Sequence, residues 1–444
     1  MTYHGLSAGP VRAQFPQPSR RSSLVRIPIR SRAALICAAL AAPLFGQSSQ
    51  YSEPGTLGRP LIDRRQALRD AVAGARWHLG GLRLDPWLSL RELAWVEEPA
   101  AEGGTLHDLT ATVGAGLQAY LPIGAQTTLA GQALPEYVWW RDRADARRLA
   151  GRYALGAFVF GNRTGLELVA RSEDTTAVAS PELDQRVAVR DDRLDGRLDL
   201  RLVRSLELFV RGNSGRVRTG DHDLVPEVAR LDRDESWWVG GLAWRFAPDL
   251  VLGLGAGAAR TEFVEEGDLR SNDGTTTYGE LSWQRPKLQV AAEISRERRE
   301  ALAGSSFAGF AGDLGEASVR WQPRERIGAA LYGLRRLSWS VQEGRVGYVD
   351  ERLGAALDLR LGWRAGLDFF YESGTQEYVA DLAAPRTDDV TSAGVGGRLT
   401  LGHGATVVAR ARRTRVENPG LGLRQDYSEI RFGLAFGGGP EGVF

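Results

Sequence analysis

Apolar and polar residues alternate along most of this chain. From residue 82 to about residue 436, runs such as 194–202 and 353–361 place an apolar side chain at every second position. Successive side chains of a β-strand point to opposite faces, so each run predicts a strand with one apolar and one polar face. The runs reach about ten residues, whereas strands of soluble proteins average about five to six and membrane-crossing strands need about 9–11. The pattern therefore favours strands that cross a membrane.

The breaks between these runs are of two kinds. Short breaks recur about every 40 residues, for example at Gly161-Asn162 and Arg204-Ser205. Longer polar segments, such as 174–186 and 374–389, lie between them. Short turns at one end and longer loops at the other are typical of an outer-membrane barrel. The fold class predicted is all-β, a transmembrane antiparallel up-and-down β-barrel of about 18 strands, within a range of roughly 16 to 20.

A spacing near 40 residues also occurs in propellers of the WD40 type. A propeller blade needs four short strands, however, and each repeat here holds one hairpin of two long strands. The barrel interpretation places the first strand at about 82–96 and the last at about 427–436.

Aromatic residues cluster near both kinds of break, as expected for two girdles at the membrane interfaces. A soluble β-sandwich would also bury aromatic residues, but it gives no reason for such long strands with charged faces. The aromatic residues near short breaks are Phe158, Phe160, Trp244, Phe246, Trp283, Trp321 and Trp363; those near long breaks are Trp95, Tyr137, Trp139, Trp140, Trp237, Trp238 and Trp339.

The N-terminal region has the pattern of an export signal. Arg26, Arg30 and Arg32 precede the apolar run 33–46, which contains the single cysteine, Cys37. A basic segment followed by a short apolar segment with small residues is typical of a secretory signal, and the run is too short to span a bilayer. Residues 1–46 are therefore predicted to be a signal peptide with a long basic N-region, which directs the chain through the general secretory route.

Residues 47–80 are predicted to form a periplasmic lead-in to the barrel, which then occupies residues 81–444. Leu61, Leu68, Ala71, Val72 and Ala75 follow helical spacing and predict a short amphipathic helix. Such a helix can lie outside the barrel or plug its pore, and the lead-in is the favoured interpretation.

Composition limits the function further. The 56 basic and 55 acidic residues give a net charge of +1, which offers no reason to expect a nucleic-acid partner. With one cysteine and five histidines, the chain has few candidates for catalysis or metal binding, so no catalytic residue, metal or cofactor is predicted. Two alternatives concern His222: a hydrolase at the barrel rim together with Ser236, and a cation site in the acidic loop 221–223. A solvated charged loop is favoured.

In the barrel interpretation, the polar face of the strands lines the lumen. Opposite charges on neighbouring strands can pair and make the wall rigid. The same charges can instead filter solutes with a weak preference for anions, and Arg410 and Arg412 beside Arg398 are the first place to test this. The candidate pore-lining residues are Arg197, Arg201, Arg360, Arg364, Arg398, Arg410, Arg412, Asp195, Asp199, Asp358 and Asp368.

The segment 80–90, Gly-Gly-Leu-Arg-Leu-Asp-Pro-Trp-Leu-Ser-Leu, resembles the opening strand of one family of proteins. These are outer-membrane β-barrel porins of Gram-negative bacteria, of the exopolysaccharide-associated type. The family's Tyr-Asp-Ser-Asn turn is replaced here by the sequence of residues 94–98.

The resemblance implies a barrel in outer-membrane lipid, inserted by the barrel-assembly machinery, that passes small solutes or polysaccharide. Assembly requires an aromatic residue at the end of the last strand, which is either Phe436 or the terminal Phe444. The alternative function is a closed barrel that acts as an adhesive or structural protein through its extracellular loops.

Overall fold

The computed structural model describes residues 53–56, 64–99, 105–180, 182, 186–220, 225–379, 385–401, 404–418, 420 and 423–437. The predicted signal peptide, His222, His403 and Phe444 lie outside the described residues.

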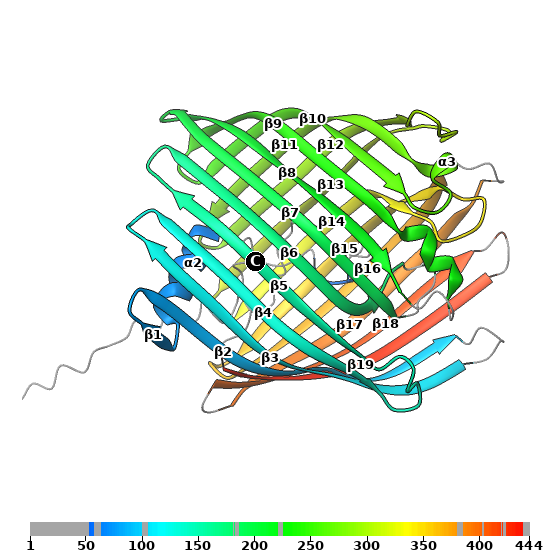
Figure 1. Ribbon diagram of the computed structural model, residues 1–444, viewed down its shortest axis with the longest axis horizontal. Coiled ribbons are helices and arrows are strands. Elements are labelled where there is room, and N and C mark those ends of the chain that lie inside the picture. The colour runs from blue at the N-terminus through cyan, green and yellow to red at the C-terminus, as the bar shows by residue number, and fades with distance from the viewer. Residues whose placement is uncertain are drawn as a thin grey trace, which may run out of the picture.

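Eighteen long strands, β2 to β19, form a closed antiparallel barrel (Figure 1). Each strand pairs with its neighbours in the sequence, and β19 pairs with β2 to close the ring. This confirms the predicted fold and strand number. The strands are β2 (Leu82–Pro99), β3 (Thr105–Ile123), β4 (Thr127–Trp140), β5 (Arg148–Phe160), β6 (Thr164–Val178), β7 (Arg186–Val203), β8 (Leu206–Thr219), β9 (Arg233–Ala247), β10 (Leu250–Phe263), β11 (Asn272–Arg285), β12 (Leu288–Ala301), β13 (Phe310–Arg324), β14 (Ile327–Trp339), β15 (Gly347–Leu361), β16 (Ala365–Val379), β17 (Thr387–Thr400), β18 (Ala405–Asn418) and β19 (Leu423–Gly437).

Within the described residues, four short elements accompany the barrel. Helix α2 (Arg64–Gly74) and strand β1 (Trp77–Leu79) precede β2, and β1 pairs with the start of β2. A 3₁₀ helix, η1 (Pro226–Leu231), and a short helix, α3 (Gly267–Arg270), lie in long loops at the opposite end of the barrel (Figure 1). Among the described residues, no helix is long and apolar enough to cross a membrane.

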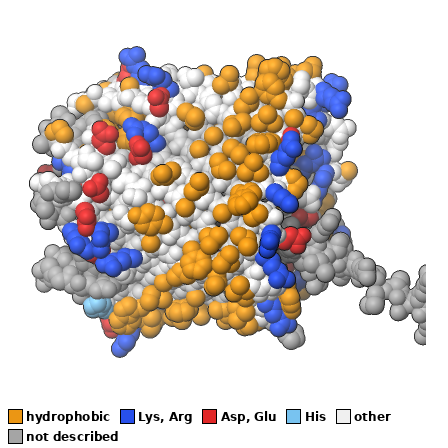
Figure 2. Space-filling model, turned by 180° about the vertical axis from the view of Figure 1, so that it is seen from behind, with side chains coloured by type: hydrophobic (Ala, Val, Ile, Leu, Met, Phe, Trp, Pro, Cys, Tyr) orange, Lys and Arg blue, Asp and Glu red, His pale blue; other side chains and the backbone are white. Residues whose placement is uncertain are grey.

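The outer wall carries a band of hydrophobic side chains, with charged side chains on both sides of it (Figure 2). Leu254 and Leu353, for example, are more than two thirds exposed (73% and 71%). Such large exposed apolar surfaces are not stable in water, whereas a lipid bilayer covers them. The apolar faces predicted from the alternation are therefore the outer faces of these strands.

The aromatic girdles are smaller than the sequence predicts. Trp95, Trp238, Trp244, Phe246 and Trp321 are 40–55% exposed on the outer wall. Tyr137 and Trp363 are exposed as well, at 44% and 69%. The girdle prediction is wrong for the members that are buried on the inner side of the wall or in loop packing. Those with an exposed fraction of at most 6% are Phe158, Trp140 and Trp339.

Strand β2 departs from strict alternation. The pairing of β2 with β3 shifts between Arg91 and Ala94, and Glu92 has a left-handed backbone with φ 56°. A bulge of this kind adds a residue to one strand and changes the face on which later side chains lie. As a result Leu88 and Trp95, which are seven positions apart, are both exposed on the outer wall.

Candidate functional site

The lumen wall is lined by the charged side chains that alternate with the outward apolar residues. Asp195 accepts a bond from Arg171 at 2.6 Å, and Arg197 donates to Asp199 at 2.5 Å on the same strand, β7. On β15, Asp358 pairs with Arg320 of β13 at 2.6 Å. These contacts are the cross-strand and same-strand ion pairs that make a sheet wall rigid.

Three further candidates have different positions. Arg360 and Arg398 lie on the inner faces of β15 and β17, as their spacing from Asp358 and Gly396 requires. Arg364 does not belong to a strand: it lies in the short turn between β15 and β16, with its guanidinium 4.1 Å from the centre of the Trp363 ring. The predicted pore-lining position of Arg364 is therefore corrected to the rim, because the strand begins only at residue 365.

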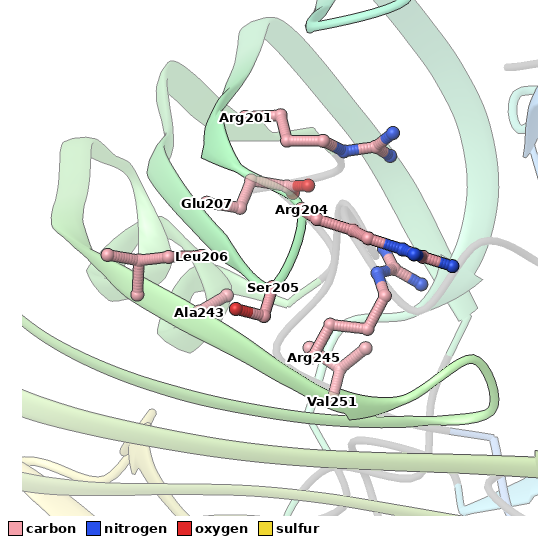
Figure 3. Close-up of a pocket in the computed structure, with 8 residues that line it drawn as sticks. All are labelled: Arg201, Arg204, Ser205, Leu206, Glu207, Ala243, Arg245 and Val251. Carbon is pink, nitrogen blue, oxygen red and sulfur yellow. The ribbon is translucent and has the colours of Figure 1, made fainter.

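Arg201 belongs to a group of arginines at the short-turn end of β7 to β9. The side chains of Arg201, Arg204 and Arg245 point to the same side, with Glu207 beside them (Figure 3). Arg201 also donates to the carbonyl of Asn162 at 3.5 Å. The group concentrates positive charge at this rim of the lumen.

A second group, which we call the arginine cluster, consists of Arg410 and Arg412 on β18 and Arg431 on β19. Glu429 accepts from Arg412 at 2.9 Å and lies 3.3 Å from Arg431. Asp368 of β16 lies 3.5 Å from Arg410. The cluster therefore brings two of the predicted pore-lining arginines and one predicted aspartate together.

Arg186 extends the arginine cluster across the lumen. It is the first residue of β7, yet its guanidinium donates to Glu429 of β19 and lies 3.4 Å from Glu92 of β2. Its side chain is 5% exposed. The Arg186 side chain therefore reaches inward and narrows the lumen beside the cluster.

A turn at residues 53–56 also lies inside the barrel, against the same part of the wall. The Glu53 carboxylate contacts Arg431, and it lies 3.5 Å from Arg410 and 3.8 Å from Arg412. The backbone N–H of Gly55 donates to Glu372 of β16 at 2.6 Å. This segment adds an acidic group to the lumen that the alternation pattern does not show.

Helix α2 follows this turn in the chain and packs on the inner wall nearer the short-turn end (Figure 1). Its Leu68 is 2% exposed among Tyr120, Phe158 and Val169, whose strands present other side chains to the outside. Arg64 pairs with Glu167 at 2.8 Å. The helix lies within the segment for which helical spacing is predicted, and its position is inside the barrel.

The long loops pack on one another at the other end. Their apolar cluster includes Val228, Phe263, Phe307 and Val341, from four different connections or strand ends. Such packing holds the loops in a fixed arrangement rather than leaving each one separately solvated.

Two buried charged groups lie in the same loops. Glu182 accepts from the Tyr378 hydroxyl at 2.7 Å and from the Val341 N–H at 2.8 Å, and burial raises the pKa of its carboxyl. Arg270 donates to the carbonyl of Ser340 at 2.7 Å, and burial lowers the pKa of its guanidinium to about 10. Both groups link neighbouring loops.

Sequence reasoning did not single out Glu53, Glu92 and Arg186 as lumen residues. Glu53 lies before the strands, Arg186 lies at the end of a predicted loop, and the bulge displaces Glu92. Period-two alternation carries no signal for such positions. In the part of the chain that the structure describes, no group of three His, Cys, Asp or Glu residues is placed to hold a metal ion.

No protein-family model matches the chain, and no curated protein matches it in sequence. Among solved structures, the crystal structure of Pseudomonas aeruginosa OpdQ matches 80% of this chain and 97% of its own, with TM-score 0.50 and 10% identity. The outer membrane protein opdK from Pseudomonas aeruginosa matches 80% of this chain and 98% of its own, with TM-score 0.50 and 11% identity.

At these identities the likeness is one of fold: the chain shares its barrel architecture with OpdQ and with the outer membrane protein opdK. The closed barrel and its apolar outer band, together with this fold, place the protein in the outer membrane. The predicted porin type is thus supported at the level of the fold, and the exopolysaccharide-associated type is not.

Proposed function

We propose that the protein is an outer-membrane channel for small polar solutes, with a lumen whose arginine side chains give a weak preference for anions. The observation that carries this proposal is the arginine cluster, in which Arg410, Arg412 and Arg431 meet on the inner wall. Guanidinium groups facing a water-filled lumen attract anions and repel cations. Transport of this kind requires no catalytic group and no cofactor.

Small solutes fit this lumen better than polysaccharide does. The turn at residues 53–56, helix α2 and the Arg186 side chain all take up space inside the barrel. An 18-strand barrel is wide enough for an aqueous channel, but internal segments reduce the free cross-section. We therefore propose small solutes as the cargo.

Export and insertion complete the proposal. Residues 1–46 direct export, and the barrel-assembly machinery inserts residues 81–444 into outer-membrane lipid. The turn at residues 53–56 and helix α2, which precede the barrel strands, then lie inside the barrel and not outside it as the favoured lead-in interpretation expected. Phe436, which pairs with Leu88 at the end of β19, is a candidate for the terminal aromatic signal. Deletion of residues 438–444 should then leave insertion intact, whereas loss of insertion would assign the signal to Phe444.

The reversal potential of the channel in a potassium chloride gradient tests the anion preference. The double variant Arg410→Gln/Arg412→Gln should shift the reversal potential toward cation selectivity, because two lumen charges are removed. Arg413→Gln is the matched control, since this neighbouring side chain is 59% exposed and lies on the outer wall, where it pairs with Asp426. Equal reversal potentials in the double variant and the wild type would contradict the proposal.

A further inference from the structure

The turn at residues 53–56 has a defined shape. The Thr56 hydroxyl donates to the carbonyl of Glu53 at 2.7 Å and closes the turn. The Gly55 N–H donates to Glu372, whose Oε1 also accepts from Tyr332 at 2.9 Å. The turn is therefore anchored to the inner wall by a carboxylate that is itself held in place.

Gly55 allows the turn to approach the wall closely. Its backbone has φ +81°, which favours glycine, and a Cβ placed there would lie 2.6 Å from the ring of Phe370. Only a residue without a side chain fits this position without a shift of the ring. The position of the turn is thus specific, and it brings Glu53 against the arginine cluster.

Glu53 offers the arginine cluster the same group that a free anion would offer. Its carboxylate contacts Arg431 and lies within 3.8 Å of Arg410 and Arg412. Glu429 and Asp368 are the wall acids that contact the cluster, and Arg186 shares Glu429. Arg186 also lies 3.4 Å from Glu92. Four guanidinium groups thus face three wall carboxylates and Glu53, so removal of Glu53 leaves one positive charge in excess, which attracts another anion.

We infer that the arginine cluster is an anion-binding site in the lumen, and that Glu53 is a tethered competitor that occupies it until a carboxylate or phosphate from solution takes its place. The inference rests on the proposed channel function and adds a binding site and an autoinhibitory segment to it. A tethered group is present at high effective concentration. Free anions can bind only while Glu53 is away from the site, so the apparent affinity equals the intrinsic affinity multiplied by the fraction of time that the site is free.

Calorimetric titration of the refolded protein with citrate and with inorganic phosphate tests the site directly. The variant Glu53→Gln should bind one or both probes about tenfold more tightly than the wild type, because the competing charge is gone. Tighter binding of citrate alone or of phosphate alone identifies the group that the site prefers. The control is Asp70→Asn, which removes a charge from α2, where Asp70 accepts a hydrogen bond from Gln66 at 2.8 Å.

Identical affinities in the wild type, Glu53→Gln and Asp70→Asn would overturn the inference. If Glu53→Gln binds citrate or phosphate more tightly but the folded barrel does not conduct, the binding site is retained and the proposed channel function is refuted. The two failures can therefore be distinguished.

A disulfide tests the displacement of the turn. A Cβ at Gly55 would lie 3.2 Å from the Cβ of Phe370, close to the range of about 3.5–4.5 Å found in disulfides. The single cysteine, Cys37, lies in the predicted signal peptide, so Gly55→Cys/Phe370→Cys should form one bond. The oxidised protein should conduct less than the reduced protein and bind citrate or phosphate more weakly. Equal conductance and equal binding in both redox states would show that the turn does not leave the site.

Discussion

The buried carboxylate of Glu182 is the group that couples the long loops to pH. It is 9% exposed and accepts hydrogen bonds from Ser340, Val341 and Tyr378, which belong to the connection after β14 and to β16. Burial penalises its charged form and raises its pKa, while the positive charges of Arg270 and Arg386 lie close enough to interact with it. The arrangement is thus more costly with a charged carboxylate than with a neutral one.

The packed loops should therefore be more stable in acid. A carboxyl whose folded pKa is raised above the usual value of 4.5 contributes stability below that value, and the contribution is lost as pH rises through the raised pKa. Hydrogen exchange of the backbone amides at 340–346, corrected for the intrinsic rate, should show less frequent opening as pH falls from 8 toward about 5. In Glu182→Gln this pH dependence should disappear, and the same slope in both proteins would contradict the assignment.

Helix α2 depends on a small contact area with the wall. Leu68 supplies its fully buried side chain, and Arg64 and Arg65 add contacts to Glu167 and to the Phe160 carbonyl. An isolated helix of 11 residues is marginal in water, so α2 is stabilised mainly by packing inside the barrel.

Truncation of Leu68 should detach the helix without unfolding the barrel. Leu68→Ala removes most of a buried side chain, which costs about 2–5 kcal/mol of stability. This loss is large compared with the small contact area that holds α2 on the wall. Amide protection of residues 64–74 should fall strongly, while the strands keep theirs. Gln66→Ala, on the exposed side of the helix, should leave protection unchanged; a loss of protection there as large as in Leu68→Ala would show that packing of Leu68 does not hold the helix.

The strands were predictable and the contents of the lumen were not, for physical reasons. Alternation fixes which residues of a strand such as β15 face lipid, because a shift of one position would expose every charge to the bilayer. The bulge between Arg91 and Ala94 moves the later side chains of β2 to the opposite face. Hydrophobic periodicity in the sequence does not reveal where such a bulge lies. Glu53 and Arg186 reach the arginine cluster through tertiary contacts, from positions 378 and 243 residues away along the chain from their partners Arg431 and Glu429.

The molecule as a whole is organised around its apolar outer band. Leu254 of β10 pairs with Leu242 of β9, which lies between Trp244 and Trp238 on that neighbouring strand. Trp238 and Trp244 are both exposed on the outer wall and suit the two interfaces of a bilayer. Leu254 therefore lies near the middle of the band.

A charge at this depth should oppose insertion. Leu254→Arg should reduce the free energy of unfolding of the inserted barrel by about 2–4 kcal/mol, as expected for arginine near the bilayer midplane. Val264→Arg, just beyond the end of β10 and 60% exposed, should cost at most about 1 kcal/mol. Urea titrations of folding into vesicles measure both values, and equal costs would contradict the placement of the band.

Single-channel conductance of the refolded mature protein in a planar bilayer tests the central claim most directly. The protein should show steady conductance with a mild preference for anions, and the conductance should rise when Glu53 is replaced by Gln. A correctly folded, heat-modifiable barrel without conductance, in the wild type and in Glu53→Gln alike, would contradict the channel and favour a closed barrel that acts through its loops.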